Sequence, residues 1–140
     1  YKPETLKKFL NQHFRDVNKL SMLTFETANF VPLGTIMRDK KGQYHGVMPN
    51  SKFITSGLTT QLVNCGAYVF DRIWVDQNID KLTINKKGEY FITELFDIAK
   101  SQNDKIGLIK LDDPKEWMSI NTQEELQIAN QKMEGINAGK

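Results

Sequence analysis

The chain of 140 residues contains one cysteine and two histidines, and both shortages exclude kinds of site. With Cys65 alone, no internal disulfide can form, and a metal centre with paired thiolates cannot be built. The lack of disulfides favours a reducing, cytoplasmic setting. No apolar run approaches the roughly 20 residues that a membrane-spanning helix needs, so we expect no membrane partner.

The chain also lacks a strong charge of either sign. Its 19 lysines and arginines nearly balance 17 aspartates and glutamates, which leaves a net charge of +2, and the lysines are spread along the sequence. A nucleic-acid partner is therefore not expected. With 39% hydrophobic and 26% charged residues, the composition is typical of one globular domain with a single core.

Familiar catalytic signatures are missing as well. The sequence has no G-x-x-x-x-G-K-[ST], no H-E-x-x-H and no G-x-S-x-G. His13 and His45 have no carboxylate or nucleophile at a suitable spacing, so we expect structural or solvated roles for both. Cys65 lies in an apolar segment and should be an inert core thiol. The pairs 112–113 and 124–125 are explained by turn and helix-start chemistry rather than by metal binding.

Apolar periodicity predicts an alternation of helices and strands. A capping box of Thr122 and Glu125 should start the last helix, which continues through Met133. The alternation predicts an α/β domain with a mixed sheet, flanking helices and a β-hairpin. We expect this domain to occupy residues 1–134, with a disordered tail at 135–140. The predicted elements are helices at 5–17 and 92–99, strands at 19–28, 61–71 and 105–111, a hairpin at 34–48 and an irregular loop at 76–88.

Three polar or small residues resist a purely structural interpretation. Asn64 interrupts an apolar strand, where its amide must find hydrogen-bond partners. Gly66 follows it where a side chain would crowd an approaching ligand. Asn121 precedes a capped helix, a favourable place for a phosphate. Structural and ligand-binding roles remain equally open for each of them at this point.

Several motifs carry a family resemblance. The stretch "GEYFITELFDIAK" (88–100), preceded by "VNCGAYVFD" (63–71) and followed by "WMSINTQEELQIAN" (117–130), resembles the C-terminal half of sugar-1-phosphate nucleotidyltransferases. The likeness is strongest to the bacterial N-acetylglucosamine-1-phosphate uridylyltransferase type. "PLGTIMRDKKGQYHGV" (32–47) is similar to that family's Y-G-[RT]-I-[VI]-R-D segment. The start "YKPETLKKFL" looks like the helix after the family's D-x-P loop, so the resemblance covers nearly the whole chain.

The resemblance implies a Rossmann-like nucleotide-diphosphosugar transferase fold and roles for individual residues. Asn64, Gly34 and Thr93 would orient the sugar, with Gly66 beside them and Phe91 as a stacking face. Asn121 would contact the substrate phosphate and Mg²⁺. The implied reaction is an in-line attack of a sugar 1-phosphate, such as N-acetylglucosamine 1-phosphate, on a nucleoside triphosphate such as UTP, which releases pyrophosphate.

Two positions depart from the family pattern. Pro49 stands where the family has a glutamate that binds the amino sugar. Phe91 stands in place of the second tyrosine of G-E-Y-Y, so the hydroxyl is lost and the aromatic ring is kept. The family's glycine-rich nucleotide-binding loop does not occur in the sequence, and its metal-binding Asp would lie just before Tyr1. We therefore expect a fragment that is inactive alone and that can self-associate through an uncovered face.

Other classes of function remain open beside this one. The first is a non-catalytic binding or regulatory module of the same fold, which Pro49 slightly favours. A glycosyltransferase of the related nucleotide-diphosphosugar fold is disfavoured because the sequence has no D-x-D motif. A purely structural domain would satisfy every named polar residue internally.

Overall fold

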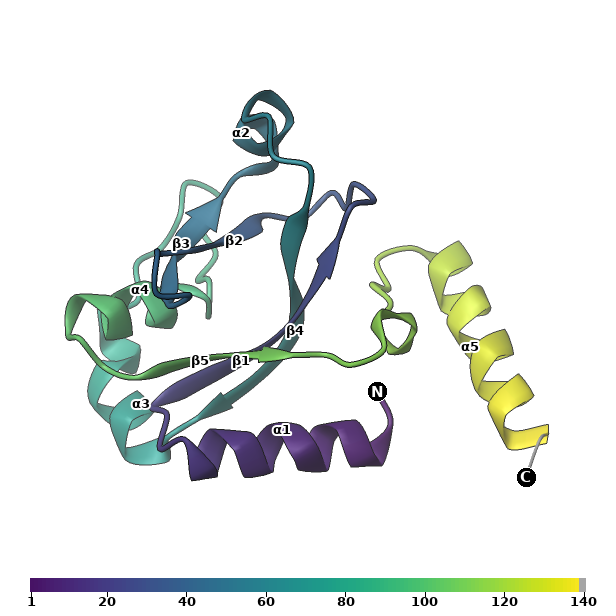
Figure 1. The fold of residues 1–140 in the computed structure, drawn as a ribbon, viewed down its shortest axis with the longest axis horizontal. Helices are drawn as coiled ribbons and strands as arrows, with labels where there is room; N and C mark the ends of the chain where they lie inside the picture. Colours follow the sequence, from purple (N-terminus) through teal and green to yellow (C-terminus); the bar gives the residue numbers. More distant parts are fainter. Residues whose placement is uncertain (139–140) are drawn as a thin grey trace.

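A five-stranded mixed sheet forms the centre of the protein, with the order β3-β2-β4-β1-β5 (Figure 1). The computed structural model describes residues 1–138, with side chains through residue 133. β1 and β5 run parallel, whereas the pairs β1–β4, β2–β3 and β2–β4 are antiparallel. The elements are α1 (Pro3–Arg15), β1 (Leu20–Thr27), β2 (Thr35–Arg38), β3 (Tyr44–Met48), α2 (Asn50–Thr55), β4 (Gln61–Phe70), α3 (Arg72–Asn78), η1 (Ile79–Lys81), α4 (Glu94–Ser101), β5 (Ile106–Lys110), η2 (Pro114–Glu116) and α5 (Gln123–Ala138).

The sheet separates two layers of core. On one face, α3 and α4 contribute Trp74, Leu95 and Phe96 to a cluster that includes Leu20 and Met22 of β1. On the other face, α1 contributes Phe9, which packs with Leu23 and other buried residues of β1, β4 and β5. β1 is therefore buried on both faces from residue 20 to residue 25, as its apolar sequence predicts. The predicted α/β class with a mixed sheet and flanking helices is confirmed, and the architecture fits a Rossmann-like fold.

Two short helices, α2 and α3, were not predicted from the sequence. α2 follows the hairpin directly, and α3 with η1 occupies part of the predicted loop 76–88. Asp71 caps α3 because its carboxylate accepts a hydrogen bond from Trp74 N at 3.0 Å. This D-x-x-W spacing is the signal in the sequence that could have placed the helix.

α5 lies to the side of the sheet and apart from it (Figure 1). None of its described side chains is buried. Its start confirms the predicted capping box, since Glu125 N donates to Thr122 Oγ1 and Thr122 N donates to Glu125 Oε2, both at 3.2 Å. α5 continues to Ala138, so it includes 135–138 of the tail expected at 135–140, and 139–140 lie outside the described residues.

No helix of the described chain is long and apolar enough to cross a membrane.

Candidate functional site

Asn64 and Gly66 lie in a β-bulge of β4. Met22 pairs with Tyr68 and Thr24 pairs with Asn64, so residues 65–67 of β4 face Leu23 alone. The Asn64 side chain closes this bulge, accepting a hydrogen bond from Gly66 N at 2.8 Å and donating one to Tyr68 Oη at 2.7 Å. The hydrogen-bond partners that the Asn64 side chain was expected to need are therefore found within β4 itself.

Gly66 gives the bulge an open surface. It is exposed, its φ is +73°, and a Cβ at this position would meet no atom within 4 Å. Only glycine adopts this left-handed conformation without strain. The backbone beside Asn64 is therefore accessible to a ligand.

The carbonyl of Cys65, in the same bulge, accepts hydrogen bonds from two distant segments. One donor is the Tyr1 hydroxyl, and the other is the Trp117 indole at 3.1 Å. Burial raises the pKa of the Tyr1 hydroxyl above its usual range, so it remains a donor. Neither Tyr1 nor Trp117 was predicted from the sequence to support the site.

Gly34 is needed for close packing at the entrance to β2. A Cβ on Gly34 would lie 2.6 Å from Val47 Cγ1 of β3. The buried side chain of Gln61 fixes the preceding loop, because its Oε1 accepts from Val31 N at 2.7 Å and its Nε2 donates to Thr35 Oγ1 at 3.2 Å. The glycine therefore has a structural reason to be present, whether or not it also contacts a ligand.

Phe91 and Thr93 lie in the segment that leads into α4. Phe91 is 54% exposed, so its ring face is open to solvent. Thr93 is the N-cap residue of α4, but its side chain makes no capping hydrogen bond, so its hydroxyl is not used to start the helix. Glu94 holds the preceding loop instead, through hydrogen bonds from Thr83 N at 3.0 Å and Thr83 Oγ1 at 2.8 Å.

Asn121 is exposed and precedes α5 as predicted. Its Nδ2 donates to Ser119 Oγ at 3.2 Å, and its backbone N donates to Glu125 Oε2 at 2.6 Å. The Glu125 carboxylate thus already occupies two N–H groups at the start of α5. A phosphate at this position would have to compete with that carboxylate.

Of the six predicted site residues, only Asn64 and Gly66 are joined to each other by a hydrogen bond among the described residues. Gly34 directly precedes β2, the segment with Phe91 and Thr93 leads into α4, and Asn121 precedes α5. The bulge is therefore the one part of the candidate site in which two predicted residues contact each other by a hydrogen bond among the described residues.

The described residues do not by themselves compose a magnesium site. Asn121 offers one side-chain oxygen, and no group of three or more His, Cys, Asp or Glu side chains suited to a metal occurs among the described residues. Mg²⁺ requires about six oxygen ligands in octahedral geometry. Asp113 instead caps η2, accepting from Lys115 N at 3.0 Å, as the turn interpretation of 112–113 predicts.

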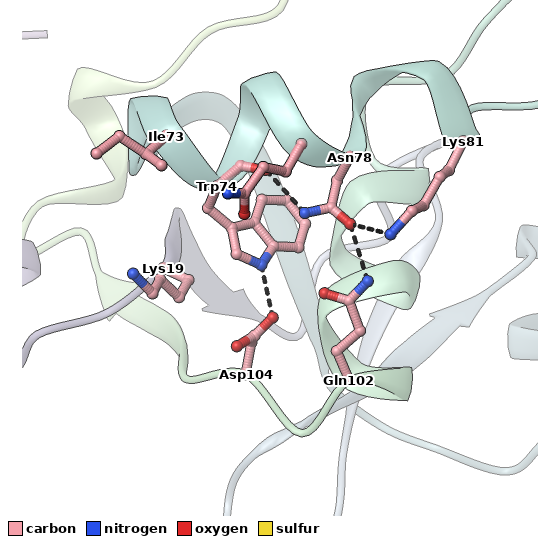
Figure 2. A pocket seen from close by; sticks show the side chains of 8 residues that line it. Lys19, Ile73, Trp74, Asn78, Lys81, Gln102 and Asp104 are labelled. Atoms are coloured by element: carbon pink, nitrogen blue, oxygen red, sulfur yellow. Dashed lines mark hydrogen bonds between the residues drawn. The ribbon is translucent and has the colours of Figure 1, made fainter.

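A separate polar hollow of about 370 Å³ lies between α3, η1 and the end of α4 (Figure 2). Trp74 donates its indole N–H to Asp104, and Asn78 accepts from Lys81 and Gln102. These hydrogen bonds link α3 to residues that follow α4, and none of the six predicted residues lines the hollow. We interpret it as a structural network that fixes α3 to the end of α4.

Comparisons with known proteins agree with the motifs. No protein-family model matches the chain. The chain is 29% identical over 124 residues to the bifunctional protein GlmU of Clostridium novyi (strain NT), which covers 88% of this chain and 27% of that protein. It is 28% identical over 119 residues to the bifunctional protein GlmU of Streptococcus equi subsp. zooepidemicus, covering 84% and 26%. The bifunctional protein GlmU of Clostridioides difficile (strain 630) is 28% identical over 133 residues, covering 94% and 29%.

The similarities confirm the resemblance to sugar-1-phosphate nucleotidyltransferases of the bacterial uridylyltransferase type. The chain spans between 26% and 29% of the length of these relatives.

Proposed function

We propose that this chain forms the sugar-phosphate-binding part of a nucleotidyltransferase. The complete enzyme transfers a nucleotidyl group from a nucleoside triphosphate to a sugar 1-phosphate and releases pyrophosphate. UTP is the proposed nucleoside triphosphate. N-acetylglucosamine 1-phosphate is the proposed sugar substrate. The family resemblance supports small-molecule substrates, and a cytoplasmic setting and Mg²⁺ as the cofactor of the complete enzyme are part of the same proposal.

The observation that carries this proposal is the similarity to bifunctional GlmU proteins over 84% to 94% of the chain. The β4 bulge supports it, because it combines a half-buried amide at Asn64 with open backbone at Gly66. An amide side chain can both donate to and accept from sugar hydroxyls. The open backbone lets a sugar approach without a steric clash.

The other predicted residues receive roles in the same proposal. Gly34 lets the backbone meet the ligand, Thr93 offers its hydroxyl, and Phe91 offers an exposed ring against which a sugar can stack. Asn121 contributes its side-chain N–H toward the phosphate and its side-chain oxygen toward the metal. Positioning and charge neutralisation carry catalysis in phosphoryl transfer, so no general base is assigned within this chain.

A second candidate function is a non-catalytic binding or regulatory module of the same fold. Pro49 favours it because proline offers no carboxylate where the family has a glutamate. The start of α5 favours it too, since Glu125 occupies the backbone donors beside Asn121. Such a module would bind a nucleotide sugar or a sugar phosphate without turnover.

The binding test uses Thr93→Val, which removes a hydroxyl that caps nothing in the structure. We expect the unmodified chain to bind N-acetylglucosamine 1-phosphate in calorimetric titration, and Thr93→Val to weaken binding about fivefold, the effect of one lost hydrogen bond. Thr59→Val, at an exposed threonine, is the matched control and should bind normally. If the unmodified chain fails to bind N-acetylglucosamine 1-phosphate, the proposed substrate is wrong.

The catalytic test requires the chain within its complete protein. Asn121→Ala should reduce the turnover number with UTP and N-acetylglucosamine 1-phosphate in a pyrophosphate-release assay. An undiminished turnover number would remove Asn121 from the site. Tight sugar-phosphate binding by a complete protein that releases no pyrophosphate would favour the non-catalytic module.

A further inference from the structure

The β4 bulge leaves a backbone carbonyl outside the sheet ladder. Since residues 65–67 face Leu23 alone, the Cys65 carbonyl must find donors elsewhere. A carbonyl oxygen has two lone pairs, and the Tyr1 hydroxyl and the Trp117 indole supply two donors. The bulge is thus fixed by side chains that are remote from it in sequence.

Trp117 is itself held on two sides. Its ring packs against Phe25 of β1, with the ring centroids 5.1 Å apart. The adjacent Glu116 accepts hydrogen bonds from Lys2 N at 3.1 Å and Thr5 Oγ1 at 2.7 Å, which ties the segment to the start of α1. The indole N–H therefore projects from an anchored segment rather than from a free loop.

Asn64 directly precedes Cys65, whose carbonyl accepts these two hydrogen bonds. The two observed hydrogen bonds of the Asn64 side chain use one amide hydrogen and one lone pair, which leaves a second donor and a second acceptor for a ligand. Both depend on the conformation of the bulge. An amide whose backbone moved by an ångström would lose the alignment that hydrogen bonds require.

We propose that Trp117 is a positioning residue, whose indole holds the β4 bulge in the conformation that presents the Asn64 amide to the sugar phosphate. The proposal rests on the proposed function for the identity of the ligand. The claim that the Trp117 indole fixes the bulge applies to the chain without ligand and is tested without ligand. The Tyr1 hydroxyl acts on the same carbonyl as the second donor.

The test compares Trp117→Phe with Trp74→Phe, each of which removes one indole hydrogen bond and keeps an aromatic ring. Trp74 donates to Asp104 in the hollow of Figure 2, outside the candidate site, and serves as the matched control. In the ¹⁵N-labelled chain, we expect Trp117→Phe to speed exchange of the Gly66 amide about fivefold and to shift the Asn64 side-chain resonances. Trp74→Phe should leave both unchanged.

The same proteins are then titrated with N-acetylglucosamine 1-phosphate below their melting temperatures. Trp117→Phe should weaken binding about fivefold, whereas Trp74→Phe should bind as the unmodified chain does. Equal Gly66 exchange in the two variants, or unaltered affinity in Trp117→Phe, would overturn the positioning role. If Trp117→Phe does not fold, Tyr1→Phe removes the second donor to the same carbonyl and should change exchange and affinity in the same direction.

Failure of the proposed function would look different. The unmodified chain would not bind the sugar phosphate at all, while the exchange comparison would still decide whether the indole holds the bulge.

Discussion

The Cys65 side chain is buried, and its carbonyl accepts two hydrogen bonds from other side chains. The thiol is 6% exposed, and burial raises its pKa to about 12. Because the thiolate is the reactive form, we expect native protein at pH 8 to react with iodoacetamide about a thousandfold more slowly than protein unfolded in guanidinium. Mass spectrometry of the alkylated chain over time measures both rates. Equal rates in the two states would show that the thiol is accessible in the native state.

His13 joins α1 to β1 in a buried polar contact. The ring is 2% exposed, and its Nδ1 lies 2.9 Å from Ser21 Oγ. Burial lowers the pKa of His13 below its usual value, although the negative charge of Asp71 opposes the shift. The folded state therefore binds fewer protons than the unfolded state below about pH 6.5.

The consequence is a loss of stability in mild acid. The free energy of unfolding should fall as the pH decreases from 7 through 6.5 toward 5, and His13→Gln should reduce that dependence. Urea denaturation of both proteins at several pH values gives the difference curve, in which the carboxylates common to both proteins cancel. A difference curve that is flat over this range would assign no proton linkage to His13.

At the scale of elements, the N-terminus of α1 is capped by the carboxylate of Glu116, which is distant in sequence. Glu116 accepts from Lys2 N and Thr5 Oγ1, and its side chain is only 10% exposed in its ion pair with Lys2. The N-cap residue Lys2 makes no capping hydrogen bond of its own. Glu116 thus provides the cap that the local sequence of α1 lacks.

Glu116→Ala should therefore lower the free energy of unfolding by about 1–2 kcal/mol, the usual effect of a lost cap. Asp112→Ala is the control, because the Lys8–Asp112 pair is exposed on both sides and should contribute less than about 0.5 kcal/mol. Chemical denaturation measures both changes. Equal losses in the two variants would mean that Glu116 acts only as a surface charge.

Elements with strong local patterns could be predicted from the sequence. Leu95, Phe96 and Ala99 form a helical apolar face and are completely buried in α4. The apolar run of β1 predicted a strand at 19–28, and the capping box predicted the start of α5. Ile92 shows the limit of the method, since it fits the periodicity yet lies before α4 and is 40% exposed.

The candidate site was harder to predict because its geometry depends on contacts across the chain. The sequence singled out Asn64 and Gly66 as candidates, yet the bulge beside them is visible only in the register between β1 and β4. The hydrogen bond from Trp117 to Cys65 joins residues 52 positions apart, and no local pattern encodes it. Asn121 was correctly placed before a helix, whereas the backbone donors taken by Glu125 were not foreseen.

For the whole molecule, the helix predicted at 5–17 leaves apolar side chains exposed. Phe9 is buried, but Leu6, Leu10, Phe14 and Val17, which share its helical spacing, are between 40% and 76% exposed. α1 ends at Arg15, and Val17 has a positive φ of 52°. The amphipathic pattern was correct, although only part of the apolar face meets the sheet.

An exposed apolar face of this kind favours association with another surface. We expect the apparent mass of the chain to rise with protein concentration in sedimentation experiments. Phe14→Lys should suppress the rise, whereas Ile54→Lys, at an equally exposed position on α2, should not. A monomer over the whole concentration range would contradict the predicted self-association, and equal suppression by both variants would assign it to general surface hydrophobicity.

The position of β1 between β4 and β5 has a consequence for biosynthesis. Its parallel partner lies far away in sequence, since Leu20 pairs with Ile106. On the ribosome, β1 emerges well before β5, so its second edge stays uncovered until the segment with Ile106 has been synthesised. Pairings between distant segments form slowly and leave apolar strands accessible in the meantime. A nascent chain that stalls before Ile106 would carry an open edge on β1, and we expect chaperones to hold it until translation resumes.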